Sequence, residues 1–243
     1  MAHVIPLWNI PSLAVRDSKD LFPVRRIFCV GRNYVEHQKE MGGDGRETPF
    51  FFLKSEHSLV AGGGDLHYPA KTANFHYETE MVVALGKGGR RIDARKANEH
   101  VFGYGVGLDM TRRDLQTDAK KLQRPWEMGK SFDESCPVST LLPVSLAGHP
   151  TKGAIWVKVN GQAKQTGDLN QQIWQVDEAI AFLSNYVTLA PGDIILNGTP
   201  AGVAAVKAGD KLHGHIDGLN DLFVTYVAAK SGATKAEAAV TAK

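Results

Sequence analysis

The segment HYETEMVVALG at residues 76–86 constrains the fold of this chain more than any other feature. It places two carboxylates, Glu78 and Glu80, directly before the apolar run at 82–85. Alternate side chains of a strand share a face, so the two glutamates point the same way, with Thr79 and Met81 opposite. The pattern predicts a strand that enters the core with two neighbouring acidic groups at its start.

Two carboxylates at such a place repel each other and lose hydration, and a divalent cation relieves both penalties. Oxygen ligands favour Mg²⁺, Mn²⁺ or Ca²⁺ over zinc or copper. Asp109 is the third candidate, because it follows the glycine-spaced, apolar run GYGVGL, where a free carboxylate is costly. A solvated strand face is the competing interpretation of Glu78 and Glu80, and the pattern alone leaves both open.

A short helix is expected over 33–41, in GRNYVEHQKEM, because the segment contains few helix breakers. His37 and Glu40 are three residues apart and would be neighbours on one face of this helix. A carboxylate beside an imidazole fixes its tautomer and raises its basicity, as a water-activating base requires. The alternative is an ordinary polar surface helix. The glycine-rich loop at 42–49 fits a lid over a site, and equally any exposed loop.

Lys130 lies in EMGKSF between small and apolar neighbours, and it is a candidate buried counter-charge for an anionic substrate. An exposed lysine with a buried stem is the alternative. Arg112 and Arg113 are candidates for binding carboxylates. Position 124 is arginine where a phosphate-binding loop would require glycine, so Gly-Lys-Ser does not indicate a nucleotide site.

Many short strand candidates and few helices predict a β-rich α+β domain. Asn160-Gly161 predicts a two-residue hairpin turn. The apolar spacing in 169–187 predicts the longest helix, with Asp168 as its cap. The remaining strands are expected near 25–31, 49–55, 194–198, 209–216 and 221–229, and a helix near 93–101.

The predicted organisation is a proline-broken lead-in at 1–24, a domain at 25–229, and a mobile Ala- and Lys-rich tail at 230–243. The 28 basic and 26 acidic side chains are dispersed along the 243 residues, so the composition indicates no nucleic-acid or membrane partner. No apolar stretch approaches the about 18 residues of a membrane helix. The two cysteines, Cys29 and Cys136, are interpreted as buried thiols of a cytoplasmic protein.

Six motifs follow one another along residues 26–227: GRNY-x-x-H-x-x-E-M, F-L-K-S, H-Y-E-x-E, G-x-D-M-T-x-R-D-x-Q, G-K-S-F-D-x-S-C-P and G-T-P-x-G-V. In this order they resemble the fumarylacetoacetate hydrolase family. The resemblance implies a mixed β-sheet roll, usually a homodimer, with bound Mg²⁺ or Mn²⁺ (or Ca²⁺ in a crystal).

The resemblance also assigns roles to individual residues. It implies metal ligation by Glu78, Glu80 and Asp109. The remaining assignments are a water-activating dyad of His37 and Glu40, stabilisation of the developing anion by Lys130, and substrate binding by Arg113, Gln116 and Thr199. Asn197 departs from the family, in which many members have threonine or tyrosine.

The activity implied is hydrolysis of a carbon–carbon bond in a small 2,4-diketo acid. Segments PFFFLKS, LDMTRRDLQ and RPWEMGKSFD are most similar to the branch that cleaves fumarylpyruvate to fumarate and pyruvate in bacterial gentisate breakdown. The alternatives are a general acylpyruvate hydrolase, an oxaloacetate decarboxylase, and a non-catalytic metal-dependent binding module.

Overall fold

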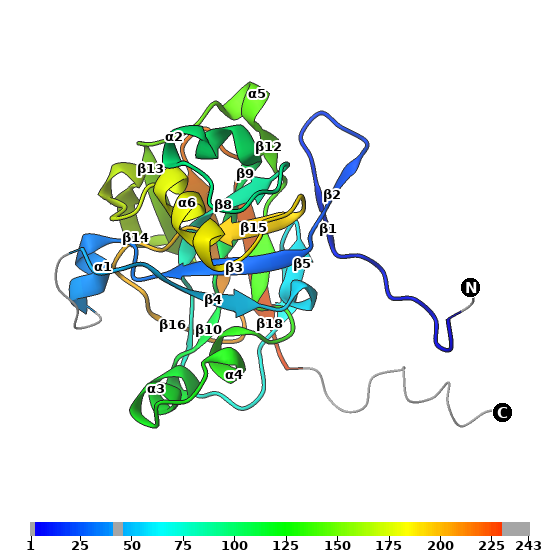
Figure 1. The fold of residues 1–243 in the computed structure, drawn as a ribbon. Helices are drawn as coiled ribbons and strands as arrows, with labels where there is room; N and C mark the ends of the chain where they lie inside the picture. Colours follow the sequence, from blue (N-terminus) through cyan, green and yellow to red (C-terminus); the bar gives the residue numbers. More distant parts are fainter. Residues whose placement is uncertain (1–2, 41–45, 230–243) are drawn as a thin grey trace.

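The main sheet of the protein is mixed and runs through the centre of the molecule (Figure 1). The computed structural model describes residues 3–40 and 46–229. Along this sheet the strand order is β4-β3-β15-β8-β9-β11-β5, and β12 also pairs with β9. The strands are β3 (Arg26–Gly31), β4 (Phe50–Lys54), β5 (Leu59–Ala61), β8 (Thr79–Leu85), β9 (Val101–Leu108), β11 (Cys136–Val138), β12 (Leu142–Pro143) and β15 (Asp193–Leu196).

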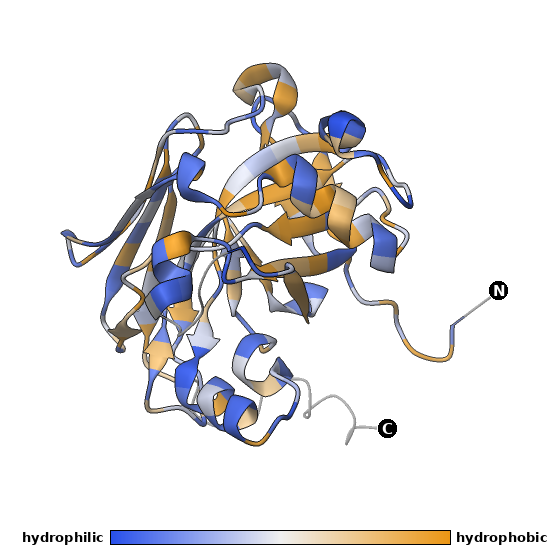
Figure 2. Ribbon diagram, turned by 60° about the vertical axis from the view of Figure 1, so that its left-hand side comes forward, coloured by the Kyte–Doolittle hydropathy of each residue, from blue (hydrophilic) through white to orange (hydrophobic). Residues whose placement is uncertain are grey.

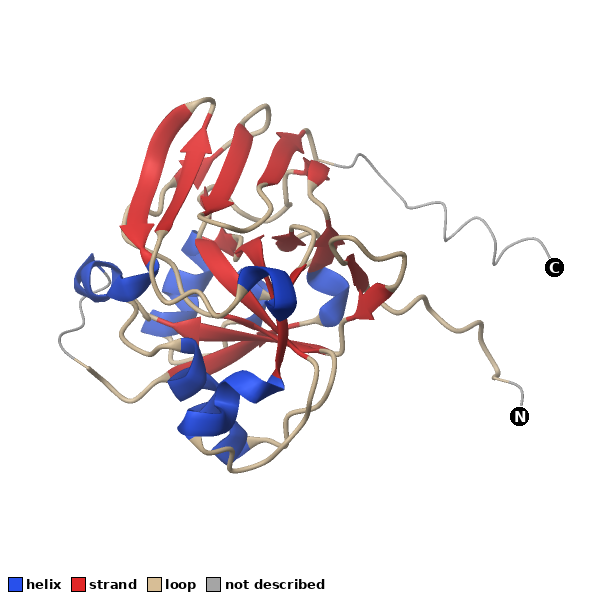
Figure 3. Cartoon of the chain, turned by 90° about the horizontal axis from the view of Figure 1, so that it is seen from above, coloured by secondary structure: helices blue, strands red, loops and turns tan. Residues whose placement is uncertain are grey.

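A second sheet of five strands forms a separate layer beside the first (Figure 3). Its order is β14-β13-β17-β18-β6, in which only β6 runs parallel to its neighbour. The strands are β6 (Gly64–His67), β13 (Ala154–Val159), β14 (Gln162–Asp168), β17 (Lys211–Ile216) and β18 (Leu222–Val227). Asn160 and Gly161 have φ of 51° and 80° between β13 and β14, which confirms the predicted two-residue turn.

The larger core lies between the two sheets, and the central strands are mainly hydrophobic (Figure 2). Every residue of β8 is buried, and after Thr79 and Glu80 the strand continues as an unbroken apolar run from Met81 to Leu85. Gly214 of β17 faces β9, where an added Cβ would lie 3.3 Å from Val106 Cγ1. The curled mixed sheets confirm the predicted β-rich α+β fold with a β-sheet roll.

Helices are short, and the longest packs against the larger core through Val176, Ala179, Ile180 and Leu183. The α-helices are α1 (Val35–Glu40), α2 (Ala94–Ala97), α3 (Arg113–Lys121), α4 (Glu127–Lys130), α5 (Val144–Ala147) and α6 (Val176–Tyr186). The 3₁₀ helices are η1 (Glu56–Ser58), η2 (Asn98–His100) and η3 (Leu169–Gln171). α3 and α4 lie together at the lower end of the molecule in Figure 1.

The longest helix begins later than the sequence pattern predicts. Asp168 caps η3, and its side chain accepts from the Asn170 amide at 2.9 Å, whereas α6 begins only at Val176. The chain between η3 and α6 is not helical, because the Ile173 amide donates to the Asn33 carbonyl at 2.8 Å and the Trp174 amide donates to Asn33 Oδ1 at 2.8 Å. Long-range hydrogen bonds therefore override a helical pattern that began at Leu169.

The strand predicted through Glu78 is also interrupted. β7 (Phe75–His76) belongs to a small sheet with β10 (Thr111–Arg112) and β16 (Ala205–Val206), and β8 starts at Thr79. The chain changes sheets at residues 77–78, so Glu78 lies in the junction rather than in a continuous strand.

Residues 12–23 of the predicted lead-in form a two-stranded hairpin, β1 (Ser12–Ala14) and β2 (Leu21–Pro23). Leu13 and Phe22 of this hairpin pack in a second, smaller hydrophobic cluster with Cys29 and Cys136, whose thiols are free and buried. The predicted tail at 230–243 lies outside the described residues, and the domain limits stay a prediction. No helix in the described part of the chain is long and apolar enough to cross a membrane.

Candidate active site

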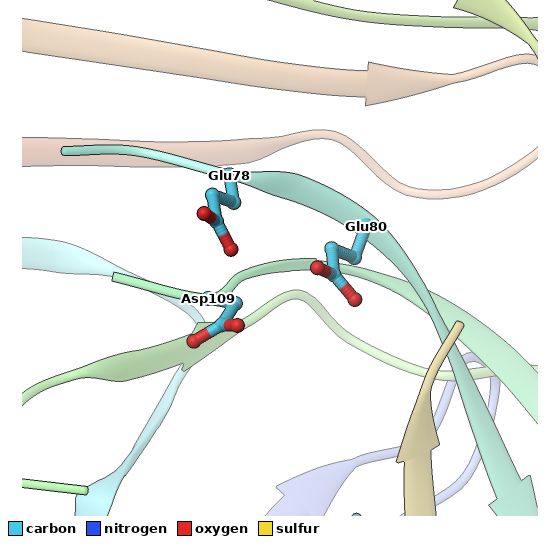
Figure 4. A group of neighbouring side chains, drawn as sticks. All are labelled: Glu78, Glu80 and Asp109. Atoms are coloured by element: carbon cyan, nitrogen blue, oxygen red, sulfur yellow. The ribbon is translucent and has the colours of Figure 1, made fainter. Parts of the chain in front are cut away.

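The carboxylates of Glu78, Glu80 and Asp109 converge at the ends of β8 and β9 (Figure 4). One oxygen of each lies within 4.8 Å of the others. The antiparallel register places Thr79 opposite Leu108, and the Asp109 amide donates to the Glu78 carbonyl at 2.8 Å. This pairing brings residues about thirty positions apart to one point, as the predicted triad requires.

The three carboxylates are 4%, 2% and 1% exposed, which excludes a solvated strand face. Burial, and then the charges of Asp109 and Glu78, raise the pKa of Glu80 well above its usual value. Burial opposes ionisation of Glu78 as well, but the charges of its neighbours outweigh burial and hold the pKa of Glu78 well below its usual value. Glu80, by contrast with Glu78 and Asp109, forms no ion pair with a described side chain. Three buried carboxylates whose oxygens converge, with one member resisting ionisation, fit a hard divalent ion such as Mg²⁺ or Mn²⁺.

Lys130 is buried and bridges two of the three carboxylates. Its Nζ donates to Glu78 Oε2 at 2.6 Å and to Asp109 Oδ2 at 2.6 Å. Although burial disfavours the charged ammonium, these two carboxylates outweigh it and raise the pKa of Lys130. Close packing explains the glycine that precedes Lys130, because a Cβ on Gly129 would lie 2.9 Å from the backbone nitrogen of Gln116 in α3. Close packing of α4 on α3 thus carries the ammonium into the site.

Arg113 and Gln116 lie on the first turns of α3 and face the same site. Arg113 Nη2 donates to Glu78 Oε1, and Arg113 Nη1 donates to Gln116 Oε1 at 2.6 Å. Arg112 lies elsewhere: its Nη1 donates to the Met128 carbonyl at 3.2 Å, and its guanidinium covers the ring of Phe132. Of the two adjacent arginines, only Arg113 lines the pocket.

His37 of α1 is 5% exposed and lines the pocket that contains the triad. The surface-helix interpretation is therefore wrong for this residue. Glu40 is the last residue of α1, and its side chain is outside the described part of the structure. The predicted lid at 42–49 falls in part on residues 41–45, which are likewise outside the described residues.

Thr199 reaches the pocket from the loop after β15. The preceding Gly198 has φ of 91°, and its amide donates to Glu80 Oε2 at 2.7 Å. Asn197 is buried behind the pocket, where its Nδ2 donates to the Trp174 carbonyl at 3.3 Å. Asn197, the residue at which this motif departs from the family, therefore anchors the loop to the chain before α6 and does not line the pocket.

Lys54 and Gln165, which contact side chains of the site, are among the residues that were not assigned roles from the sequence. Lys54 is 2% exposed, and its Nζ lies 2.9 Å from Asp109 Oδ1. Gln165 Nε2 donates to Thr199 Oγ1 at 2.9 Å, and Gln165 Oε1 accepts from the Thr79 amide at 3.1 Å. Lys54 could have been noticed in the sequence, because it is a charged residue that ends the apolar run FFFL. Gln165 could not, because nothing in the segment AKQTG marks it as a site residue.

The pocket is a polar recess with aromatic walls. It is lined by Val30, Gly31, Arg32, His37, Phe50, Phe52, Glu78, Glu80, Asp109, Arg113, Gln116, Lys120, Trp126, Lys130 and Thr199. All residues to which the family resemblance gave a role, and whose side chains are described, belong to this recess, whereas Arg112 does not. The arrangement combines an imidazole, a site for a hard cation and fixed positive charges, as enzymes do that stabilise a developing oxyanion.

This fold and site define a class of metal-dependent enzyme. The chain matches the model of the fumarylacetoacetate hydrolase C-terminal domain over residues 26–226. It belongs to the fumarylacetoacetate hydrolase family.

Three relatives define its neighbourhood in this family. The fumarylpyruvate hydrolase of Ralstonia sp is 46% identical over 74% of this chain and 93% of its own length. The mitochondrial oxaloacetate decarboxylase of Dictyostelium discoideum is 42% identical over 81% of this chain and 90% of its own length. The crystal structure of the Pseudomonas aeruginosa fumarylpyruvate hydrolase, in complex with Mn²⁺ and pyruvate, has a TM-score of 0.91 and 47% identity, covering 93% of this chain and 100% of that chain.

Proposed function

We propose that this enzyme hydrolyses a carbon–carbon bond in a 2,4-diketo acid, with fumarylpyruvate as the substrate and fumarate and pyruvate as the products. The observation that carries the proposal is that His37 lines the same pocket as the carboxylate triad and Lys130. The Pseudomonas aeruginosa relative supports it, because pyruvate, present in that complex, is one product of the proposed cleavage.

Glu78, Glu80 and Asp109 would hold the divalent ion. When bound, the ion would polarise the ketone oxygen of the substrate and offset the negative charge that develops there.

The side chains around the triad would perform the proton transfers and the orientation. His37, oriented by Glu40, takes a proton from water, and the water oxygen forms a bond to the C4 carbonyl carbon. The C3–C4 bond breaks, and its electron pair becomes the pyruvate enolate. Protonation at C3 releases pyruvate, while C4 leaves as a carboxylic acid.

Lys130 would donate from Nζ to the enolate oxygen, in a buried site where a fixed charge acts strongly. Arg113 and Gln116 would position the substrate from α3. Thr199 would donate to the substrate carboxylate. Gln165 Nε2 already donates to Thr199 Oγ1, so the hydroxyl proton of Thr199 is available for this contact.

The proposal extends to a cytoplasmic homodimer that acts in gentisate breakdown, with residues 25–229 as its catalytic domain. These parts rest on the family resemblance.

Decarboxylation of oxaloacetate is the second candidate, favoured by the 42% identity to the Dictyostelium discoideum decarboxylase. Both reactions produce a pyruvate enolate, but decarboxylation needs no attacking water. The role of His37 therefore separates the two.

The test is a spectrophotometric panel of fumarylpyruvate, acetylpyruvate and oxaloacetate with added Mg²⁺ or Mn²⁺. We expect the diketo acids to be hydrolysed, and His37→Asn to lower kcat by about 10²- to 10⁴-fold. His57→Asn is the matched control, because His57 is exposed and does not line the pocket. Much faster turnover of oxaloacetate, with His37→Asn unchanged, would favour the decarboxylase instead.

A further inference from the structure

Among the described residues, the pocket is lined by four cationic side chains, of which only two form ion pairs with the carboxylate triad. Lys130 and Arg113 are paired with Glu78, and Lys130 also with Asp109. Arg32 and Lys120 line the same pocket, yet neither forms an ion pair with any described carboxylate. Arg32 and Lys120 are therefore two cations of the pocket without a carboxylate partner among the described residues.

Arg32 is held at the pocket by the backbone that follows β3. Its φ is 53°, in the left-handed region that a residue without glycine's freedom rarely adopts. Its Nε is buried and has no hydrogen-bond partner among the described residues. The guanidinium carbon lies 5.9 Å from the centroid of the Phe50 ring. A buried donor without a partner is costly, so this position indicates that a ligand supplies one.

Lys120 approaches the same space from α3. Its Nζ lies 5.0 Å from the centroid of the Trp126 ring. Burial, and then the charges of Arg32 and Arg113, lower the pKa of Lys120 to about 8. Both side chains line the one pocket, and their positive charges repel each other there. An anion placed between them would relieve this repulsion.

The walls of this part of the pocket are aromatic. The rings of Phe50 and Trp126 meet edge to face with centroids 5.6 Å apart, and those of Phe52 and Trp126 lie 5.8 Å apart. Flat apolar walls suit a planar, unsaturated carbon chain. The recess therefore offers a polar inner end at the triad, aromatic walls, and additional cations.

We propose that Arg32 and Lys120 form an anion subsite that binds the carboxylate at the far end of the acyl group. The preferred substrates would then be dicarboxylates, in which the inner carboxylate belongs to the diketo acid and the outer one to an unsaturated acyl chain. This inference rests on the proposed function and makes it narrower, because an acylpyruvate with an uncharged acyl group would leave the subsite empty.

The experiment compares fumarylpyruvate, with two carboxylates, and acetylpyruvate, with one, in the Mn²⁺-loaded enzyme. Arg32→Met and Lys120→Met should each lower kcat/KM for fumarylpyruvate by roughly 10- to 100-fold, the range expected for a lost charge-assisted hydrogen bond. The kcat/KM for acetylpyruvate should change by less than about 3-fold, because the free energy equivalent to a 3-fold change is well below that of one charge-assisted hydrogen bond. Lys120→Arg, which keeps the charge, should restore most of the loss.

Lys121→Met is the matched control, because Lys121 is the next residue of α3 and is exposed. It should leave both substrates unaffected. Equal losses on the two substrates in Lys120→Met, or no loss on fumarylpyruvate, would overturn the subsite.

Calorimetric binding to the Mn²⁺-loaded His37→Asn enzyme separates failure of the subsite from failure of the proposed reaction. If the wild type hydrolyses neither diketo acid but Lys120→Met weakens the binding of fumarylpyruvate alone, the subsite stands and the reaction is wrong. If hydrolysis occurs, and adding Lys120→Met to the His37→Asn enzyme leaves its affinity for both diketo acids unchanged, the reaction stands and the subsite is wrong.

Discussion

Lys54 Nζ lies 2.9 Å from Asp109 Oδ1, and the two side chains are 0% and 1% exposed. Lys54 also donates to the carbonyls of Met110 and Lys130 and to Ser135 Oγ at 3.2 Å. It therefore lies on the side of Asp109 away from the pocket, which it does not line. One carboxylate is thus held between two lysines, with Lys130 at the pocket and Lys54 behind it.

Lys54→Met should lower the free energy of unfolding by about 3–5 kcal/mol, because removing one partner of a buried pair leaves an uncompensated charge. The measurement is urea unfolding of metal-free protein. Lys39→Met is the control, since the Lys39–Glu36 pair is largely exposed and should contribute less than about 1 kcal/mol. Equal effects of the two substitutions would contradict a structural role for Lys54.

Removal of the metal should destabilise the protein and abolish its activity, because Glu80 then faces two other buried carboxylates and has no ion pair of its own among the described residues. Restoring Mn²⁺ at about 100 times its Kd should add about 2.7 kcal/mol of stability. The comparison is thermal unfolding in chelator and in Mn²⁺ at matched ionic strength. Glu80→Gln removes one ligand charge and should lose most of this response. A Glu80→Gln protein that responds to Mn²⁺ as the wild type does would argue against the triad.

The fold was predictable where a local pattern agrees with the tertiary contacts. The Asn160-Gly161 turn is one case, because its residue types suit the left-handed conformations that the structure has there. The helix over 169–187 failed at its start because Asn33, far away in sequence, binds the backbone of Ile173 and Trp174. No pattern within the helix reveals that competition.

The site was predictable in a similar, partial way. Spacing suggested that Glu78 and Glu80 share a face, although Glu78 lies in the junction between two sheets. The glycine-spaced run made Asp109 a third candidate and the ordered motifs gave it a role, but only the β8–β9 register brings it to the two glutamates. Arg32, Lys120 and Gln165 escaped notice because their significance depends on which side chains surround them in space.

Gly198→Ala should displace the loop that fixes Glu80. A Cβ at this position would lie 2.5 Å from Asn33 Cβ, and φ of 91° is strained for alanine. We expect weaker Mn²⁺ binding and a loss of about 1–3 kcal/mol of stability. Gly209→Ala is the matched control, because Gly209 has φ of 96° but open space around it. If both variants bind Mn²⁺ equally well, crowding at Asn33 does not affect the site.

Asp193→Asn should destabilise the main sheet without changing the chemistry. Asp193 is buried at the start of β15, where Arg26 donates from Nε at 2.9 Å and from Nη2 at 2.6 Å to its two carboxylate oxygens. An amide cannot accept this two-bond contact, so the loss should approach the about 3–5 kcal/mol of a broken buried pair. Asp17→Asn, at an exposed pair with Arg16, should change little in the same unfolding measurement. A KM that is unchanged in Asp193→Asn would show that its effect is on stability.

The affinity for a dicarboxylate should decrease as the pH rises through about 8. Lys120 has its pKa lowered to about 8, so it is charged below that pH and neutral above it. Because kcat/KM reports the ionisation of the free enzyme, its value for fumarylpyruvate should fall on the alkaline side while that for acetylpyruvate stays level. Lys120→Arg should move the alkaline decrease to higher pH, since arginine stays charged there. An alkaline decrease of the same size for both substrates, unmoved by Lys120→Arg, would assign the titration to another group and leave Lys120 without a part in binding.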